Sequence, residues 1–115
     1  MKIVFDENVP WPLRKFLPGH DVTSVQREGF GGMENGALLG VLDGKFDLFI
    51  LCDKNLRYQQ NLLNRVIAII ELPTNRWPVL MKLKTEITRA VEGASSGSYQ
   101  TVEEPDTGES GGRLN

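Results

Sequence analysis

The sequence contains one cysteine and one histidine, too few for an internal disulfide or for a zinc site built from the usual ligands. A single thiol is typical of a protein from a reducing compartment. No segment approaches the roughly 20 apolar residues that a membrane helix needs. The chain begins with a short apolar run, Ile3-Val4-Phe5, that ends in charge at Asp6 and so indicates a buried strand rather than a signal peptide. We therefore expect a cytoplasmic protein without membrane contact.

The sequence also lacks a large excess of charge of one sign. Its formal net charge is -2, from 13 Lys and Arg residues against 15 Asp and Glu residues. A protein that coats nucleic acid is usually basic, so broad and tight binding to RNA or DNA is disfavoured. A nuclease with a local basic rim around an acidic centre is still compatible with this balance. The chain has 115 residues, 40% of them hydrophobic, which suits one globular domain with one core.

Apolar runs mark the expected strands. Three of them, residues 3–5, 48–52 and 66–70, are apolar throughout and predict strands buried on both faces, whereas residues 21–25 alternate and predict a strand nearer an edge. Helices are expected over residues 13–17, 33–42, 56–63 and 78–91. This alternation predicts an α/β fold, a three-layer α/β/α arrangement around a small, mostly parallel sheet of about four strands joined by right-handed crossovers.

The composition changes near Gly93. From there the chain is rich in Gly, Ser and Glu and has too few apolar residues to join a core. We therefore expect a folded domain over residues 1–92, followed by a disordered, acidic, Gly/Ser-rich tail over residues 93–115.

Carboxylates follow two of the apolar runs directly. Asp6 comes after the first strand and Asp53 after the third, while Glu34 stands at the start of a helix that follows a Gly-rich loop. Ligands bind to open parallel sheets beyond the carboxyl ends of the strands, so we expect these three side chains to lie at one edge. Gathered carboxylates repel one another, and a hard cation such as Mg²⁺ or Mn²⁺ removes that penalty. Phosphodiester hydrolysis is the reaction that this chemistry suggests.

Each of these residues also has a structural reading. Asp after a strand often caps a helix or forms a turn, and Glu in a first helical turn is favoured by the helix dipole. Glu7 is expected to be a solvated or secondary group, Cys52 to be inert packing in its strand, and Trp11 to cover one end of the core.

The opening Met1-Lys2-Ile3-Val4-Phe5-Asp6-Glu7-Asn8-Val9-Pro10 resembles that of small prokaryotic PIN-like proteins, where a strand leads into an Asp-Glu-Asn motif. Gly19-His20-Asp21-Val22 is similar to their second strand, and Glu34 matches the acid that starts their next helix. Leu51-Cys52-Asp53-Lys54-Asn55 resembles the third strand with its Asp-Lys-Asp type motif. The resemblance covers about residues 1–72.

The resemblance implies a metal-dependent ribonuclease of the toxin type, neutralised by a small antitoxin protein. Asp6, Glu34 and Asp53 would be its catalytic and metal-binding acids. Asn55 stands where the family has a second acid in the third-strand motif, and its amide oxygen can ligate a hard cation without adding charge. Lys54 and Arg57 are the candidate RNA contacts, although a solvated helix face also explains the polar segment around Arg57.

Two other functions stay open at this stage. A catalytically silent PIN-like module that binds a partner would explain Asn55 and the acidic net charge. A phosphoacceptor receiver domain also places acids after its first and third strands and binds Mg²⁺, but it needs a hydroxyl residue after the fourth strand, where only Thr74 is available, and a lysine after a fifth. A homodimer is a further possibility, because small α/β domains often pair.

Overall fold

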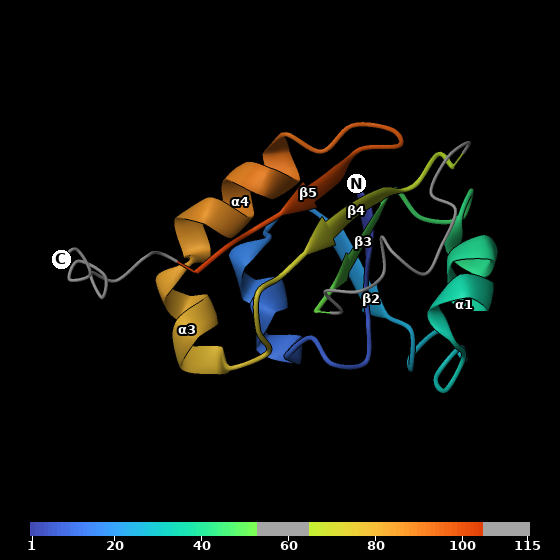
Figure 1. Cartoon of the computed structure of the whole chain (residues 1–115), viewed down its shortest axis with the longest axis horizontal. Helices are drawn as coiled ribbons and strands as arrows, with labels where there is room; N and C mark the ends of the chain where they lie inside the picture. Colours follow the sequence, from blue (N-terminus) through green and yellow to red (C-terminus); the bar gives the residue numbers. More distant parts are fainter. Residues whose placement is uncertain (53–64, 105–115) are drawn as a thin grey trace, which may run out of the picture.

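The computed structural model describes residues 1–52 and 65–104, which fold around one parallel sheet (Figure 1). The predicted helix over residues 56–63 lies outside these residues. The sheet has five strands in the order β2-β1-β3-β4-β5, and every neighbouring pair is parallel. The α/β class is thereby confirmed, with one strand more than the sequence predicted. The strands are β1 (Lys2–Phe5), β2 (Asp21–Ser24), β3 (Leu48–Leu51), β4 (Ala68–Glu71) and β5 (Tyr99–Thr101).

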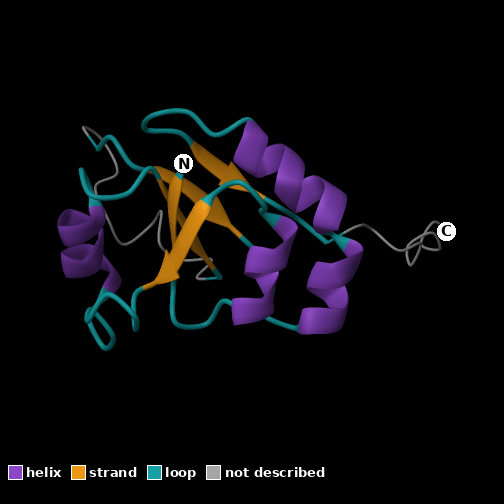
Figure 2. Ribbon diagram, turned by 180° about the vertical axis from the view of Figure 1, so that it is seen from behind, coloured by secondary structure: helices purple, strands orange, loops and turns teal. Residues whose placement is uncertain are grey.

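Helices cover both faces of the sheet, which explains why β1, β3 and β4 are apolar on both sides (Figure 2). On one face, here called the α4 face, lie the 3-10 helix η1 (Trp11–Phe16) and the helices α3 (Trp77–Lys82) and α4 (Lys84–Glu92). Helix α1 (Asn35–Leu42) covers the other, the α1 face. In β1 the side chains alternate as the pleat requires, with Ile3 and Phe5 in the core of the α4 face and Val4 in that of the α1 face.

The helix predicted over residues 78–91 is two helices that meet at Leu83. This residue leaves the helical conformation (φ -98°, ψ 13°), and its N–H donates a hydrogen bond to the carbonyl of Leu80. Leu80 before the break and Ile87 after it are buried in the same core. A spacing of three and four residues persists across such a break, so the sequence pattern did not reveal it. None of the helices in residues 1–52 and 65–104 has the length and hydrophobicity to cross a membrane.

Strand β5 corrects the prediction that disorder begins near Gly93. Residues 99–101 pair with β4, and Val102 is buried at 5% exposure. Polar contacts hold the strand: the Arg65 guanidinium donates to two carbonyls in the turn before β5, and the Tyr99 hydroxyl donates to the Glu71 carboxylate at 2.6 Å. Because both partners lie beside β4, far back in the chain, the composition of the C-terminal region did not indicate them.

The connection between β4 and β5 differs in hand from the one between β1 and β2. The first runs through α3 and α4 and the second through η1, and all three helices pack on the α4 face. The two connections cross this face in opposite directions, since β2 and β5 lie at opposite edges of the sheet. They therefore have opposite hands, and the expectation of uniformly right-handed crossovers is wrong. On this face Ile50 and Ile70 share one core with buried residues of η1, α3 and α4.

We expect Tyr99→Phe to lower the free energy of unfolding by about 1–3 kcal/mol, because it leaves the buried Glu71 carboxylate without its phenol donor. Thermal or urea unfolding measures the change. Thr101→Val removes a hydroxyl from an exposed position of the same strand and should leave stability within about 0.5 kcal/mol of the wild type. Equal stability of the two variants would show that β5 is not docked in solution.

Candidate functional site

The order of the strands reverses between β1 and β3. From β1 the chain first moves to β2 on one side and then crosses to β3 on the other, so the loops at the carboxyl ends of β1 and β3 diverge. Asp6 follows β1 at this point, and its N–H continues the ladder by donating to the Ile50 carbonyl at 2.9 Å. The backbone of Asp6 is thereby fixed at the position where open parallel sheets bind their ligands.

Cys52 marks the end of β3 beside Asp6. Its thiol donates to the Thr74 carbonyl at 3.4 Å. Burial, and after it the negative charge of Asp6, raises the pKa of the thiol from 9.0 to about 12. The Asp6 carboxylate is therefore close enough to influence the thiol of Cys52, the last residue before Asp53. The thiol stays neutral, as expected of inert packing. The other residues predicted for this segment lie outside the described residues: Asp53, Lys54, Asn55 and Arg57.

Glu7 holds the Gly-rich loop against the end of β1. Its carboxylate accepts a hydrogen bond from the N–H of Gly32, and its carbonyl accepts one from the Gln26 side chain at 3.4 Å. A side chain at position 31 would meet Glu7 Oε2 at 3.1 Å, and Gly32 has a φ of +88°. Both positions therefore favour glycine. Glu7 is exposed, as expected of a solvated or secondary group, and this contact helps to fix where the next helix begins.

Glu34 begins α1 at the N-cap position, one residue before the first helical turn in which the sequence placed it. Its backbone is extended (φ -71°, ψ 152°) and its carbonyl accepts the N–H of Leu38 at 2.8 Å. The exposed carboxylate forms no capping hydrogen bond with the helix. Because Gly32 is bonded to Glu7, the start of α1 is tied to the same edge of the sheet as Asp6.

A metal centre made from these acids stays a prediction. Within residues 1–52 and 65–104, no three His, Cys, Asp or Glu side chains are arranged to hold a metal ion. Asp6 and Glu34 belong to this part of the chain, whereas the third predicted acid, Asp53, follows directly after it.

A further carboxylate at this edge, Glu71, was not singled out from the sequence. It ends β4 in register with Leu51, the last residue of β3, and only 3% of it is exposed. It faces the α1 side, as Leu51 does, and the Tyr99 hydroxyl satisfies it. The available signal was a charged residue that directly ends an apolar run. Its burial and its partner indicate a structural role.

Two arginines that the sequence did not indicate as functional, Arg14 and Arg27, lie beside Trp11. Trp11 packs edge-on against Phe5 at the end of the core, as predicted, with 6.0 Å between ring centroids. The guanidinium carbon of Arg14 lies 4.8 Å and that of Arg27 4.2 Å from the centroid of the Trp11 ring. Arg14 belongs to η1 and Arg27 to the loop after β2. We call Trp11, Arg14 and Arg27 the arginine rim.

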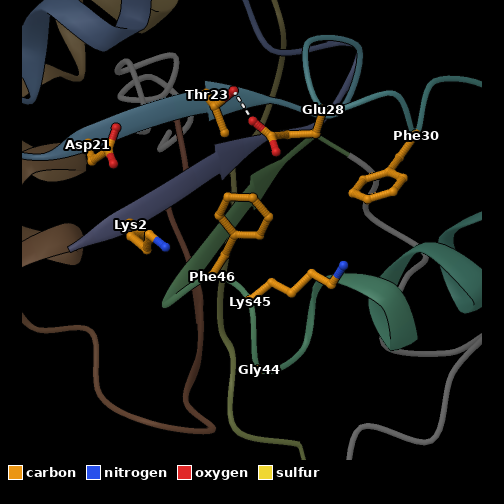
Figure 3. Close-up of a pocket in the computed structure, with 8 residues that line it drawn as sticks. All are labelled: Lys2, Asp21, Thr23, Glu28, Phe30, Gly44, Lys45 and Phe46. Atoms are coloured by element: carbon orange, nitrogen blue, oxygen red, sulfur yellow. Dashed lines mark hydrogen bonds between the residues drawn. The ribbon is translucent and has the colours of Figure 1, made fainter.

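A separate cavity of about 540 Å³ opens on the α1 face beside β2 (Figure 3). On one side of the cavity the Thr23 hydroxyl donates a hydrogen bond to the Glu28 carboxylate at 2.9 Å. On the opposite side the Phe46 ring lies between the side chains of Lys2 and Lys45. With two lysines and two carboxylates, the lining has no net charge, and neither Asp6 nor Glu34 belongs to it. Its residues are Lys2, Asp21, Thr23, Glu28, Phe30, Gly44, Lys45 and Phe46.

Comparison of the chain with protein-family models, with curated proteins and with solved structures gave no match.

The contact between Asp6 and Cys52 predicts the reactivity of the thiol. A pKa near 12 in place of 9.0 lowers the thiolate fraction at pH 8 by roughly a thousandfold, so iodoacetamide should label native Cys52 far more slowly than the unfolded chain. Asp6→Asn removes the smaller of the two causes and should speed labelling measurably, while burial keeps the pKa above its usual value. Glu28→Gln, at the separate cavity, serves as the control. Equal rates for Asp6→Asn and the wild type would place the Asp6 carboxylate away from the sulfur.

Proposed function

We propose that this chain is a metal-dependent ribonuclease that hydrolyses RNA phosphodiesters at the carboxyl edge of its sheet. Asp6, Glu34 and Asp53 would hold Mg²⁺ or Mn²⁺. The observation that supports this most is the position of Asp6, which follows β1 where the strand order reverses. Its charge contributes to the raised pKa of Cys52, the residue that precedes Asp53. The resemblance of the opening and third-strand motifs to PIN-like proteins points to the same reaction and, by extension, to a small antitoxin partner.

The donor set fits a hard cation. Its proposed members offer carboxylate oxygens, and Asn55 would add a neutral amide oxygen, whereas soft metals prefer thiolates. Cys52 does not compete as a ligand, because its thiol is neutral and bonded to the Thr74 carbonyl. When bound, such a cation lowers the pKa of water and neutralises charge on a phosphate group.

The residues of the chain have distinct tasks in this proposal. The bond from the Asp6 N–H to Ile50 fixes one carboxylate to the rigid centre of the sheet. Glu7 fixes the loop that carries Glu34 to the same edge, so it acts as a positioning residue. Lys54 and Arg57 are proposed to contact the RNA near Asp53, where their charge would offset repulsion between the acids and the phosphates.

The strand order favours one alternative from another class. The order β2-β1-β3-β4-β5 is the doubly wound order that receiver domains share with flavodoxins. A receiver needs a lysine after its fifth strand, but Val102, Glu103 and Glu104 follow β5. Thr74, its required hydroxyl residue, stands beyond the end of β4 and uses its carbonyl to accept from Cys52. Labelling of Asp53 by acetyl phosphate would favour the receiver, and the absence of labelling the nuclease.

Asn55 favours a second alternative, a catalytically silent module that keeps the fold and binds a protein partner. Titration with Mn²⁺ separates the two, because the nuclease should bind metal through its carboxylates and the silent module should not.

The decisive test is cleavage of a mixed RNA pool in the presence of Mg²⁺ or Mn²⁺, with chelator as the reference. We expect Asp6→Ala and Asp53→Ala each to lower the rate by roughly 100-fold or more, because each removes charge from the reacting centre. Glu92→Ala, an exposed carboxylate at the end of α4, should cleave like the wild type. Cleavage that survives both aspartate changes, or none with any metal in a folded and partner-free protein, would refute the proposed site.

The stability of Asp53→Asn separates a site of clustered acids from a structural cap. In a site of clustered acids the variant should melt at the wild-type temperature or higher, because the amide relieves carboxylate repulsion while cleavage is lost. A sharp fall in melting temperature would instead identify Asp53 as a cap or turn residue.

A further inference from the structure

The arginine rim lies next to the carboxyl edge of the sheet, where Asp6, Glu7 and Glu34 are found. Trp11 begins η1, after the loop that starts with Asp6, and Arg27 lies in the loop that follows β2, the neighbour of β1. Both segments leave the sheet at its carboxyl edge, and Trp11 packs on the α4 face there. The rim therefore flanks Asp6 on the side of β2.

The guanidinium groups of Arg14 and Arg27 share one ring, and no carboxylate of the described part of the chain is paired with either. The negative face of Trp11 offsets part of the repulsion between two cations that approach the same ring. An anion bound to either guanidinium would offset more of it. In a chain with a net charge of -2, such a concentration of positive charge stands out as a place for a ligand of opposite sign.

The rim is also preorganised. Trp11 is held by Phe5, Arg14 is anchored by a bond from Nη1 to the Trp11 carbonyl at 3.2 Å, and the backbone N–H of Arg27 donates to Ser24 Oγ at 3.3 Å. A guanidinium beside an aromatic ring keeps most of its N–H groups available at its edge, where they match the two oxygens of a phosphate. Groups that are ordered before binding lose little entropy when the ligand arrives.

We propose that Arg14 and Arg27 bind the backbone phosphates of a single-stranded RNA and position the strand across the carboxyl edge toward Asp6. The identity of the strand rests on the proposed ribonuclease function, while the affinity of the rim for phosphate does not. Asp6, Glu7 and Glu34 repel a polyanion at this edge, so a substrate strand needs cations close by. The arginine rim supplies two of them, from η1 and from the loop after β2.

Binding is measured with a fluorescein-labelled single-stranded RNA by anisotropy in the presence of chelator, which separates binding from cleavage. Arg14→Gln and Arg27→Gln should each weaken the affinity by roughly two- to fivefold at 0.1 M salt. Each should also reduce the slope of log K against log salt by about 0.7, the value for one phosphate contact on a single strand. Arg89→Gln, at an exposed arginine in the last turn of α4, makes the same charge change away from the edge and should alter neither quantity.

Arg27→Lys keeps the charge but loses the planar fork, so its affinity should fall between those of the wild type and Arg27→Gln. Melting curves confirm that each variant is folded. Rim variants that bind like Arg89→Gln, or a wild type that does not bind the RNA at low salt, would overturn the proposal. If the rim changes weaken binding but no metal supports cleavage, the phosphate site stands and the ribonuclease function fails. If cleavage depends on Asp6 while the rim changes leave binding unaltered, the ribonuclease function stands and the phosphate site fails.

Discussion

The pairing of β1 with β3 at the centre of the sheet is the contact on which the rest of the structure depends. Ile3 pairs with Leu48 and Phe5 with Ile50, and all four side chains are completely buried. Both strands are apolar on both faces. A strand of this kind at the edge of the sheet would expose part of its apolar surface to water, so both occupy the centre. Their pairing places β2 on one side and β4 on the other, creates the reversal of strand order, and sets Asp6 beside the end of β3.

The polar groups at the carboxyl edge are organised by contacts between loops. Glu7 holds Gly32 and thereby the start of α1, while Trp11 gathers Arg14 and Arg27 from separate elements. Negative charge thus concentrates at the end of β1 and the start of α1, and positive charge lies beside it. This arrangement suits a ligand that carries both a cation and phosphate groups, which is the chemistry that the proposed ribonuclease requires.

The parts of the fold that could be predicted are those with a local cause. The runs that form β1, β3 and β4 are visible because burial on both faces demands uninterrupted apolar residues. The break at Leu83 was missed because Leu80 and Ile87 keep their helical spacing on either side of it. Strand β5 was missed because its stability comes from Arg65 and Glu71, which the composition of the last segment does not reflect.

For the candidate site the division is similar. The sequence by itself determined that Asp6 and Asp53 follow buried strands and that Glu34 starts a helix, because partition of apolar residues from water depends on local pattern. Only the tertiary structure decided that β1 and β3 are neighbours and that Glu7 and Trp11 recruit residues from distant segments. Such contacts depend on which surfaces meet when the strands pack, and the pattern of any one segment leaves that choice open.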